Sequence, residues 1–320
     1  MEKFERFLIL ILKIAIAYTI LEQILSLGGL RESFAEFYSN AGIVTVGAGA
    51  PEITVKRFGL YRVWGLVGSP QLLGVFHIIS LLFMLQKKET FWATASFIAI
   101  IFSTSKTAYL LLIIVGFLFL LQKRHFLSLI FFVIFTLFVS FGLWEFYLYL
   151  DDMNKIHLYP ELYQFVGSIE GYFQLISYRK DPDDLFFVSG GALNSLTTYF
   201  QQNPLDLILG RGVTYSFMNI DALAQTPFIS YDYLTSEFYF LSFFEQYGII
   251  GILLLLIVFI YYPLKEILIS KNNYYPYIPL IVLLSMLHYS PIVSKLMMIF
   301  TSYALWSIYF KKKENLDERV

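Results

Sequence analysis

Long apolar runs separated by short polar stretches dominate this chain. A helix that crosses a bilayer needs roughly 20 mostly apolar residues, and the pattern predicts about eight such segments. The predicted spans cover residues 7–27, 70–86, 89–104, 107–121, 126–148, 238–262, 275–292 and 295–310. The pattern therefore predicts an all-α fold, in which residues 1–320 form a single integral membrane domain built as a polytopic helical bundle.

Basic residues flank the predicted spans mainly on one side. Cytoplasmic connections carry an excess of Lys and Arg, so this side is expected to be cytoplasmic, together with both termini. The residues concerned are Lys3, Arg6, Lys87, Lys88, Lys123, Arg124, Lys265, Lys271, Lys311, Lys312 and Lys313. Two long segments are then expected to face outward: a first one at 28–69 and a large, acidic loop at 150–237, for which short helices over the membrane are expected.

Composition narrows the classes of function. Charged residues make up 15% of the chain, against about a quarter in a typical soluble domain. The net charge of −1 argues against a nucleic-acid partner, because no basic stripe is present to neutralise phosphates. The chain has no Cys, which excludes disulfides and thiolate catalysis. It also lacks metal-ligand and nucleotide-binding motifs, so neither a metal nor a cofactor is expected.

Three basic residues lie in short motifs near the predicted outer surface. Arg62 stands in RVWGLVGSPQLLGVF, where glycines and Pro70 precede a span, so that exposed backbone N–H groups could face an anion. Lys106 stands in STSKTAYLLLII at the tip of a helical hairpin, and Arg211 stands in LGRGVTYSF. Arg suits bidentate phosphate binding, and Lys acts as a point charge. The alternative for each residue is contact with lipid headgroups or pairing with a loop carboxylate.

The order of these motifs, followed by SEFYFLSFFEQYGIIG, resembles the O-antigen polymerase and O-antigen ligase family of membrane glycosyltransferases. Family members usually have Asn where this chain has Gln71, and Arg where it has Lys106. Ligases typically carry a His-Asn pair where this chain has Ser236 and Glu237, which favours the polymerase branch. Several more spans usually precede the first motif, so the resemblance leaves open a short variant or an absent N-terminal part.

The resemblance implies a polymerase that joins undecaprenyl-pyrophosphate-linked repeat units at the outer face of the bacterial inner membrane, with a chain-length regulator membrane protein as a further partner. Arg62 and Arg211, assisted by Lys106, would bind the pyrophosphate leaving group. Glu237 and His288 are the main candidates for the base that activates the acceptor hydroxyl, and Asp232 is a third.

Three alternatives remain at this point. A ligase would transfer the finished glycan to lipid A-core. A transporter or flippase would explain the intramembrane charges Lys13 and Glu22, although no inverted repeat is visible. A non-catalytic assembly protein is the third, and it would tolerate replacement of Arg62 and Arg211.

Overall fold

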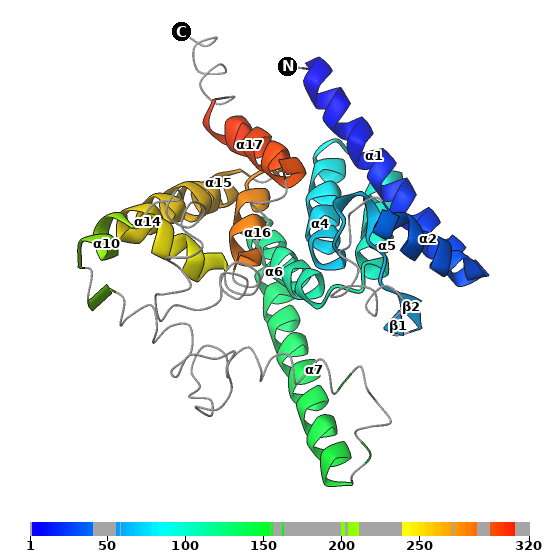
Figure 1. Cartoon of the computed structure of the whole chain (residues 1–320). Coiled ribbons are helices and arrows are strands. Elements are labelled where there is room, and N and C mark those ends of the chain that lie inside the picture. The colour runs from blue at the N-terminus through cyan, green and yellow to red at the C-terminus, as the bar shows by residue number, and fades with distance from the viewer. Residues whose placement is uncertain are drawn as a thin grey trace. The chain divides into compact units, whose positions relative to one another are not determined.

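The computed structural model describes residues 2–40, 56–57, 59–153, 155, 162, 200–201, 204–210, 239–270, 272–286 and 295–310. These residues are mostly helical (Figure 1), as predicted. The helices are α1 (Glu2–Leu25), η1 (Ser26–Leu30), α2 (Arg31–Asn40), η2 (Gly65–Val67), α4 (Pro70–Gln86), α5 (Thr90–Phe102), α6 (Lys106–Gln122), α7 (Phe126–Asp152), α10 (Pro204–Leu209), α14 (Tyr239–Leu256), η4 (Ile257–Tyr261), α15 (Tyr262–Ile269), α16 (Tyr277–Ser285) and α17 (Lys295–Tyr309). The sequence did not predict the short antiparallel hairpin of β1 (Lys56–Arg57) and β2 (Leu60–Tyr61).

Three helical stretches in the described part of the chain are long and apolar enough to cross a membrane. They cover Lys3–Phe34, Phe126–Asp152 and Gln246–Ile269. Four shorter apolar helices lie at Leu72–Gln86, Thr90–Phe102, Lys106–Gln122 and Leu296–Tyr309. Helix α4 has the predicted bounds 70–86, whereas α7 extends past the predicted end at 148. Of the predicted span 275–292, residues 287–292 lie outside the described residues.

The chain divides into two compact units. Unit 1 comprises Met1–Leu129, Tyr262–Ser285 and Pro291–Val320, and unit 2 comprises Ile130–Tyr261 and Met286–Ser290. Unit 1 is therefore assembled from pieces that lie far apart in the sequence, with nearly all of unit 2 inserted between them.

Helix α4 forms the centre of unit 1. It contacts α1, α5, α6 and α16, and its Phe76 and Phe83 rings meet Phe300 of α17 with centroid separations of 5.8 and 5.3 Å. Its sequence, PQLLGVFHIISLLFMLQ, is apolar around the whole circumference, which is typical of a helix enclosed by others. The one His in this helix, His77, is fully buried and pairs through Nε2 with Thr19 Oγ1 at 2.9 Å.

Polar contacts gather at the end of unit 1 where α4 finishes. Lys87 forms an ion pair with Glu5 of α1 at 2.6 Å, and the Tyr275 hydroxyl donates to the same Glu5 carboxylate at 2.8 Å. Lys123, after α6, donates to Asn272 at 2.8 Å. The connections that carry Lys87 and Lys123 were expected on one side of the membrane. In the structure they lie at the same end of unit 1.

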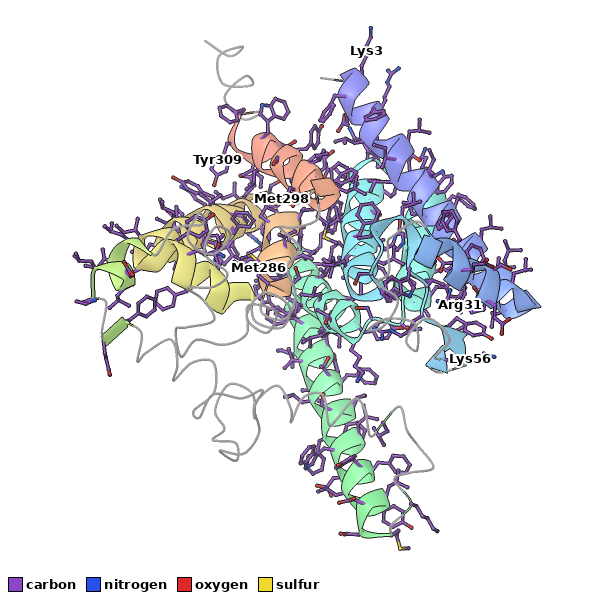
Figure 2. The ribbon with its side chains drawn as sticks, in the orientation of Figure 1. Lys3, Arg31, Lys56, Met286, Met298 and Tyr309 are labelled. Atoms are coloured by element: carbon purple, nitrogen blue, oxygen red, sulfur yellow. The ribbon has the colours of Figure 1, made fainter. Side chains whose placement is uncertain are left out.

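Unit 2 contains most of α7, together with α10, α14 and η4. No residue in the most apolar window of α7 is buried, and Figure 2 shows its side chains projecting around the helix. Helix α10 packs against α14. Within α14 the backbone leaves helical geometry at Gly248, where φ is 61° and ψ is −165°.

Candidate functional site

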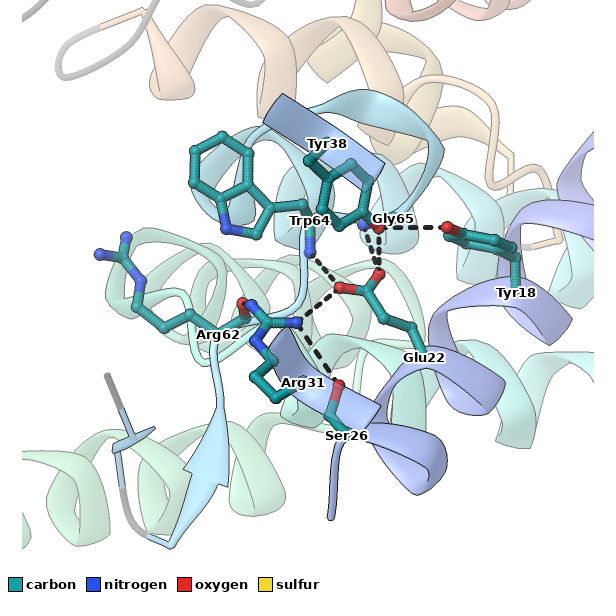
Figure 3. Close-up of polar contacts among 8 residues, drawn as sticks. All are labelled: Tyr18, Glu22, Ser26, Arg31, Tyr38, Arg62, Trp64 and Gly65. Carbon is teal, nitrogen blue, oxygen red and sulfur yellow. Dashed lines mark hydrogen bonds and ion pairs between the residues drawn. The ribbon is translucent and has the colours of Figure 1, made fainter. Parts of the chain in front are cut away.

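A fully buried carboxylate, that of Glu22 near the end of α1, organises the polar interior of unit 1 (Figure 3). Its Oε1 accepts from Arg31 Nη1 at 2.9 Å and from the Trp64 backbone N–H at 3.1 Å. Its Oε2 accepts from the Tyr38 hydroxyl at 2.7 Å and from the Gly65 backbone N–H at 2.9 Å. A buried charge is stable only with such compensation, and here a cation and three neutral donors supply it.

Two of the groups that donate to Glu22, those of Arg31 and Tyr38, lie on the segment that follows α1. The chain changes direction at Gly29, where φ is 100°, and α2 then carries Arg31 and Tyr38 back towards α1. Burial and the neighbouring Glu22 carboxylate raise the pKa of the Tyr38 phenol well above its usual range. Tyr38 therefore remains protonated and can donate to Glu22, while its oxygen lies 3.2 Å from that of Tyr18.

The turn at Gly65 presents two successive N–H groups to Glu22. Gly65 has φ +56°, and a Cβ at this position would lie 2.5 Å from Leu73 Cδ1 and 3.1 Å from Thr19 Oγ1. A side chain there would be strained and crowded, so the turn requires glycine. The chain then forms η2 and enters α4 at Pro70, a residue suited to the first turn of a helix.

The RVWG motif therefore does face an anion, but the anion belongs to the protein. The N–H groups of Trp64 and Gly65 are bound to Glu22, so they are not available to a phosphate in this structure. The carbonyl of Arg62 accepts a hydrogen bond from Nη2 of Arg31. The Arg62 side chain is 3% exposed, and its guanidinium extends away from Glu22 (Figure 3).

Lys106 begins α6, directly after the hairpin turn that follows α5. Ser105 caps α6, because its side chain accepts from the Ala108 N–H at 3.3 Å. Ser103 Oγ donates to the Ile100 carbonyl at 2.6 Å. These contacts give Ser103 and Ser105 a structural role in the turn, and they fix the backbone from which Lys106 projects.

Helix α4, which follows the RVWG turn, contacts the STSK turn through Gly74. A Cβ on Gly74 would lie 2.5 Å from Ala108 Cβ and 2.8 Å from both Ser103 Oγ and Ser105 Cβ. Only a residue without a side chain lets α4 approach the turn this closely. The first part of α4 and the α5–α6 turn thus form one packed region. Lys87 lies at the opposite end of this 17-residue helix.

Three predicted site residues, Arg211, Glu237 and His288, lie outside the described residues, as does Asp232. Gly210, which precedes Arg211, lies against Gly248 in unit 2: a Cβ on Gly248 would lie 2.5 Å from the carbonyl oxygen of Ile208. Gly210 and the first glycine of the GIIG motif therefore meet backbone to backbone.

Sequence reasoning missed Arg31 and Tyr38. Glu22 lies within a predicted span, and a carboxylate there requires a nearby cation or donors. Arg31, nine residues further on, was the available signal. The other charge in that span, Lys13, pairs with Glu89 at 2.5 Å.

The described residues contain no cluster of three or more His, Cys, Asp or Glu side chains that could hold a metal ion. Comparisons of the chain with protein-family models, with curated proteins and with solved structures found no match.

Proposed function

We propose that this chain is a membrane glycosyltransferase that polymerises undecaprenyl-pyrophosphate-linked repeat units into a surface polysaccharide. The observation that carries the proposal is the pairing of the motifs in space. Gly74, on the helix that follows Arg62, packs against the turn that precedes Lys106, and Gly210, which precedes Arg211, lies against Gly248 of the GIIG sequence that follows Glu237.

The proposed reaction moves the growing glycan from its lipid pyrophosphate to a hydroxyl of the incoming lipid-linked unit. The bond between the anomeric carbon and the pyrophosphate oxygen breaks, and a new glycosidic bond forms. Arg62, Arg211 and Lys106 would stabilise the charge that develops on the leaving pyrophosphate. Glu237 or His288 would take the proton from the acceptor hydroxyl. The reaction needs no metal and no cofactor.

The proposal includes a multi-pass arrangement of about eight spans in a bacterial inner membrane, with both termini cytoplasmic. Its support is the gathering of Lys87, Lys123 and their partners at the end of unit 1 where α4 finishes. The Arg62 and Lys106 motifs lie where α4 begins, which is the end that would face outward.

Glycan length profiles test this function. A bacterial strain lacking the gene would be complemented with wild type, Arg62→Ala, Arg211→Ala or the control Lys123→Ala. A polymerase predicts single repeat units in the deletion strain, and a ladder of lengths with wild type and the control only. Loss of even the single-unit product would identify a ligase or a flippase instead. Full ladders from both Arg variants would rule out the proposed pyrophosphate site.

A further inference from the structure

The indole N–H of Trp64 has no hydrogen-bond acceptor among the described residues, although the side chain is only 8% exposed. A buried donor without an acceptor costs free energy, and in native proteins such a group calls for a specific explanation. The backbone N–H of the same residue is bound to Glu22, so only the indole donor remains to be explained.

The indole is held in a fixed position. Its ring packs against the Tyr38 ring, with centroids 6.3 Å apart, and Phe34 packs against the same pair. Tyr38 is in turn bound to Glu22 through its hydroxyl. An N–H group anchored in this way is oriented before any ligand arrives, which lowers the entropic cost of binding.

The indole also lies on the same side of its segment as the guanidinium of Arg62. In Figure 3 both side chains extend away from the side on which Glu22 lies, while the backbone N–H groups of Trp64 and Gly65 point towards Glu22. The internal carboxylate therefore lies on one side of the RVWG turn, and the buried Arg62 guanidinium and Trp64 indole lie on the other.

We propose that Trp64 is a second pyrophosphate-binding residue, whose indole N–H donates to a phosphoryl oxygen of the lipid-borne pyrophosphate that Arg62 binds; this inference rests on the proposed function. Indole nitrogen donates and cannot accept, so it suits a ligand group that offers only acceptors. A pyrophosphate is such a group, and a donor without charge adds to its binding without further repulsion against Arg62.

The test measures binding of farnesyl pyrophosphate to the full chain in lipid nanodiscs, with inorganic pyrophosphate as the lipid-free probe. Trp64→Phe removes the N–H, and replacement of Trp64 by benzothienylalanine removes it while keeping the shape of the ring system. Trp92→Phe is the matched control, because Trp92 lies on α5 beside Lys13. Arg62→Lys reports on the proposed pyrophosphate site itself, and thermal unfolding is recorded for every variant.

We expect both Trp64 replacements to raise the Kd for farnesyl pyrophosphate about tenfold, the benzothienylalanine variant without loss of thermal stability. Wild type should bind inorganic pyrophosphate more weakly than the lipid form. Unchanged affinity in both Trp64 variants, with weaker binding in Arg62→Lys, would overturn the role of Trp64 and leave the proposed function standing. Equal affinity for the two probes would overturn the lipid-borne ligand. No binding by wild type would overturn both proposals.

Discussion

The backbone nitrogen of Gly210 lies so close to Gly248 that a Cβ on Gly248 would be 2.6 Å from it. Both residues also have positive φ, 77° at Gly210 and 61° at Gly248. We therefore expect Gly210→Ala and Gly248→Ala each to destabilise the protein by about 2 kcal/mol or more, through strain and steric overlap. Thermal unfolding of the purified chain would measure this.

The control for the glycine pair is Gly142→Ala on α7, where no atom lies within 4 Å of the added Cβ. It should leave the unfolding temperature unchanged or slightly higher, since Ala favours helix over Gly. Equal behaviour of the three variants would contradict a tight contact between Gly210 and Gly248.

The ion pair between Glu22 and Arg31 should be strongly coupled. Removing one partner of a buried pair leaves a charge or donors without compensation, so Glu22→Gln and Arg31→Met should each cost about 3 kcal/mol or more of stability. The double variant should cost less than the sum of the two. Denaturant unfolding of all four proteins in a double-mutant cycle gives the coupling energy.

The partly exposed pair of Lys13 and Glu89 provides the comparison for this cycle. Its coupling should be well below that of Glu22 and Arg31, because solvent-accessible pairs contribute little. A coupling near zero for both pairs would mean that Glu22 is held by its neutral donors rather than by Arg31.

Gly74 should control the packing of α4 against the α5–α6 turn. Gly74→Val adds a branched side chain where even a Cβ would lie 2.5 Å from Ala108 Cβ, so we expect a loss of about 1–3 kcal/mol. Gly28→Val, at a position with nothing within 4 Å, is the matched control. If both variants unfold at the same temperature, α4 and the turn do not pack as described.

Lys106 offers a test of charge against shape in the proposed polymerase. Lys106→Arg keeps the charge and adds the planar fork that favours bidentate phosphate contacts, so glycan chain length should be maintained or increased. Lys106→Ala should shorten the chains, while Lys123→Ala should not, because Lys123 lies at the other end of α6. Full-length chains from Lys106→Ala would exclude Lys106 from the leaving-group site.

The apolar pattern alone was sufficient to predict the bounds of α4 and the start of α7, because burial and helical hydrogen bonding both follow from an uninterrupted apolar run. The anion that binds the backbone N–H groups of the RVWG turn could not be predicted in this way. Glu22 and Gly65 are 43 residues apart, and no local pattern specifies which carboxylate reaches which N–H.

The same limit applies to the site. Sequence motifs made Arg62 and Lys106 candidates, but the contact of α4 with the α5–α6 turn through Gly74 is long-range and leaves no local signal. Arg31 and Tyr38 carry no motif at all. Their importance follows from the burial of Glu22, which only the folded chain reveals.

The enclosed position of α4 has a consequence for biogenesis. Helices that surround it are synthesised both before it and long after it, since Phe76 and Phe83 meet Phe300 of α17. During synthesis one flank of α4 therefore lacks its final neighbour until about 200 further residues have been made. In that interval a chaperone or insertase would find this flank accessible, and loss of α17 would leave it permanently so.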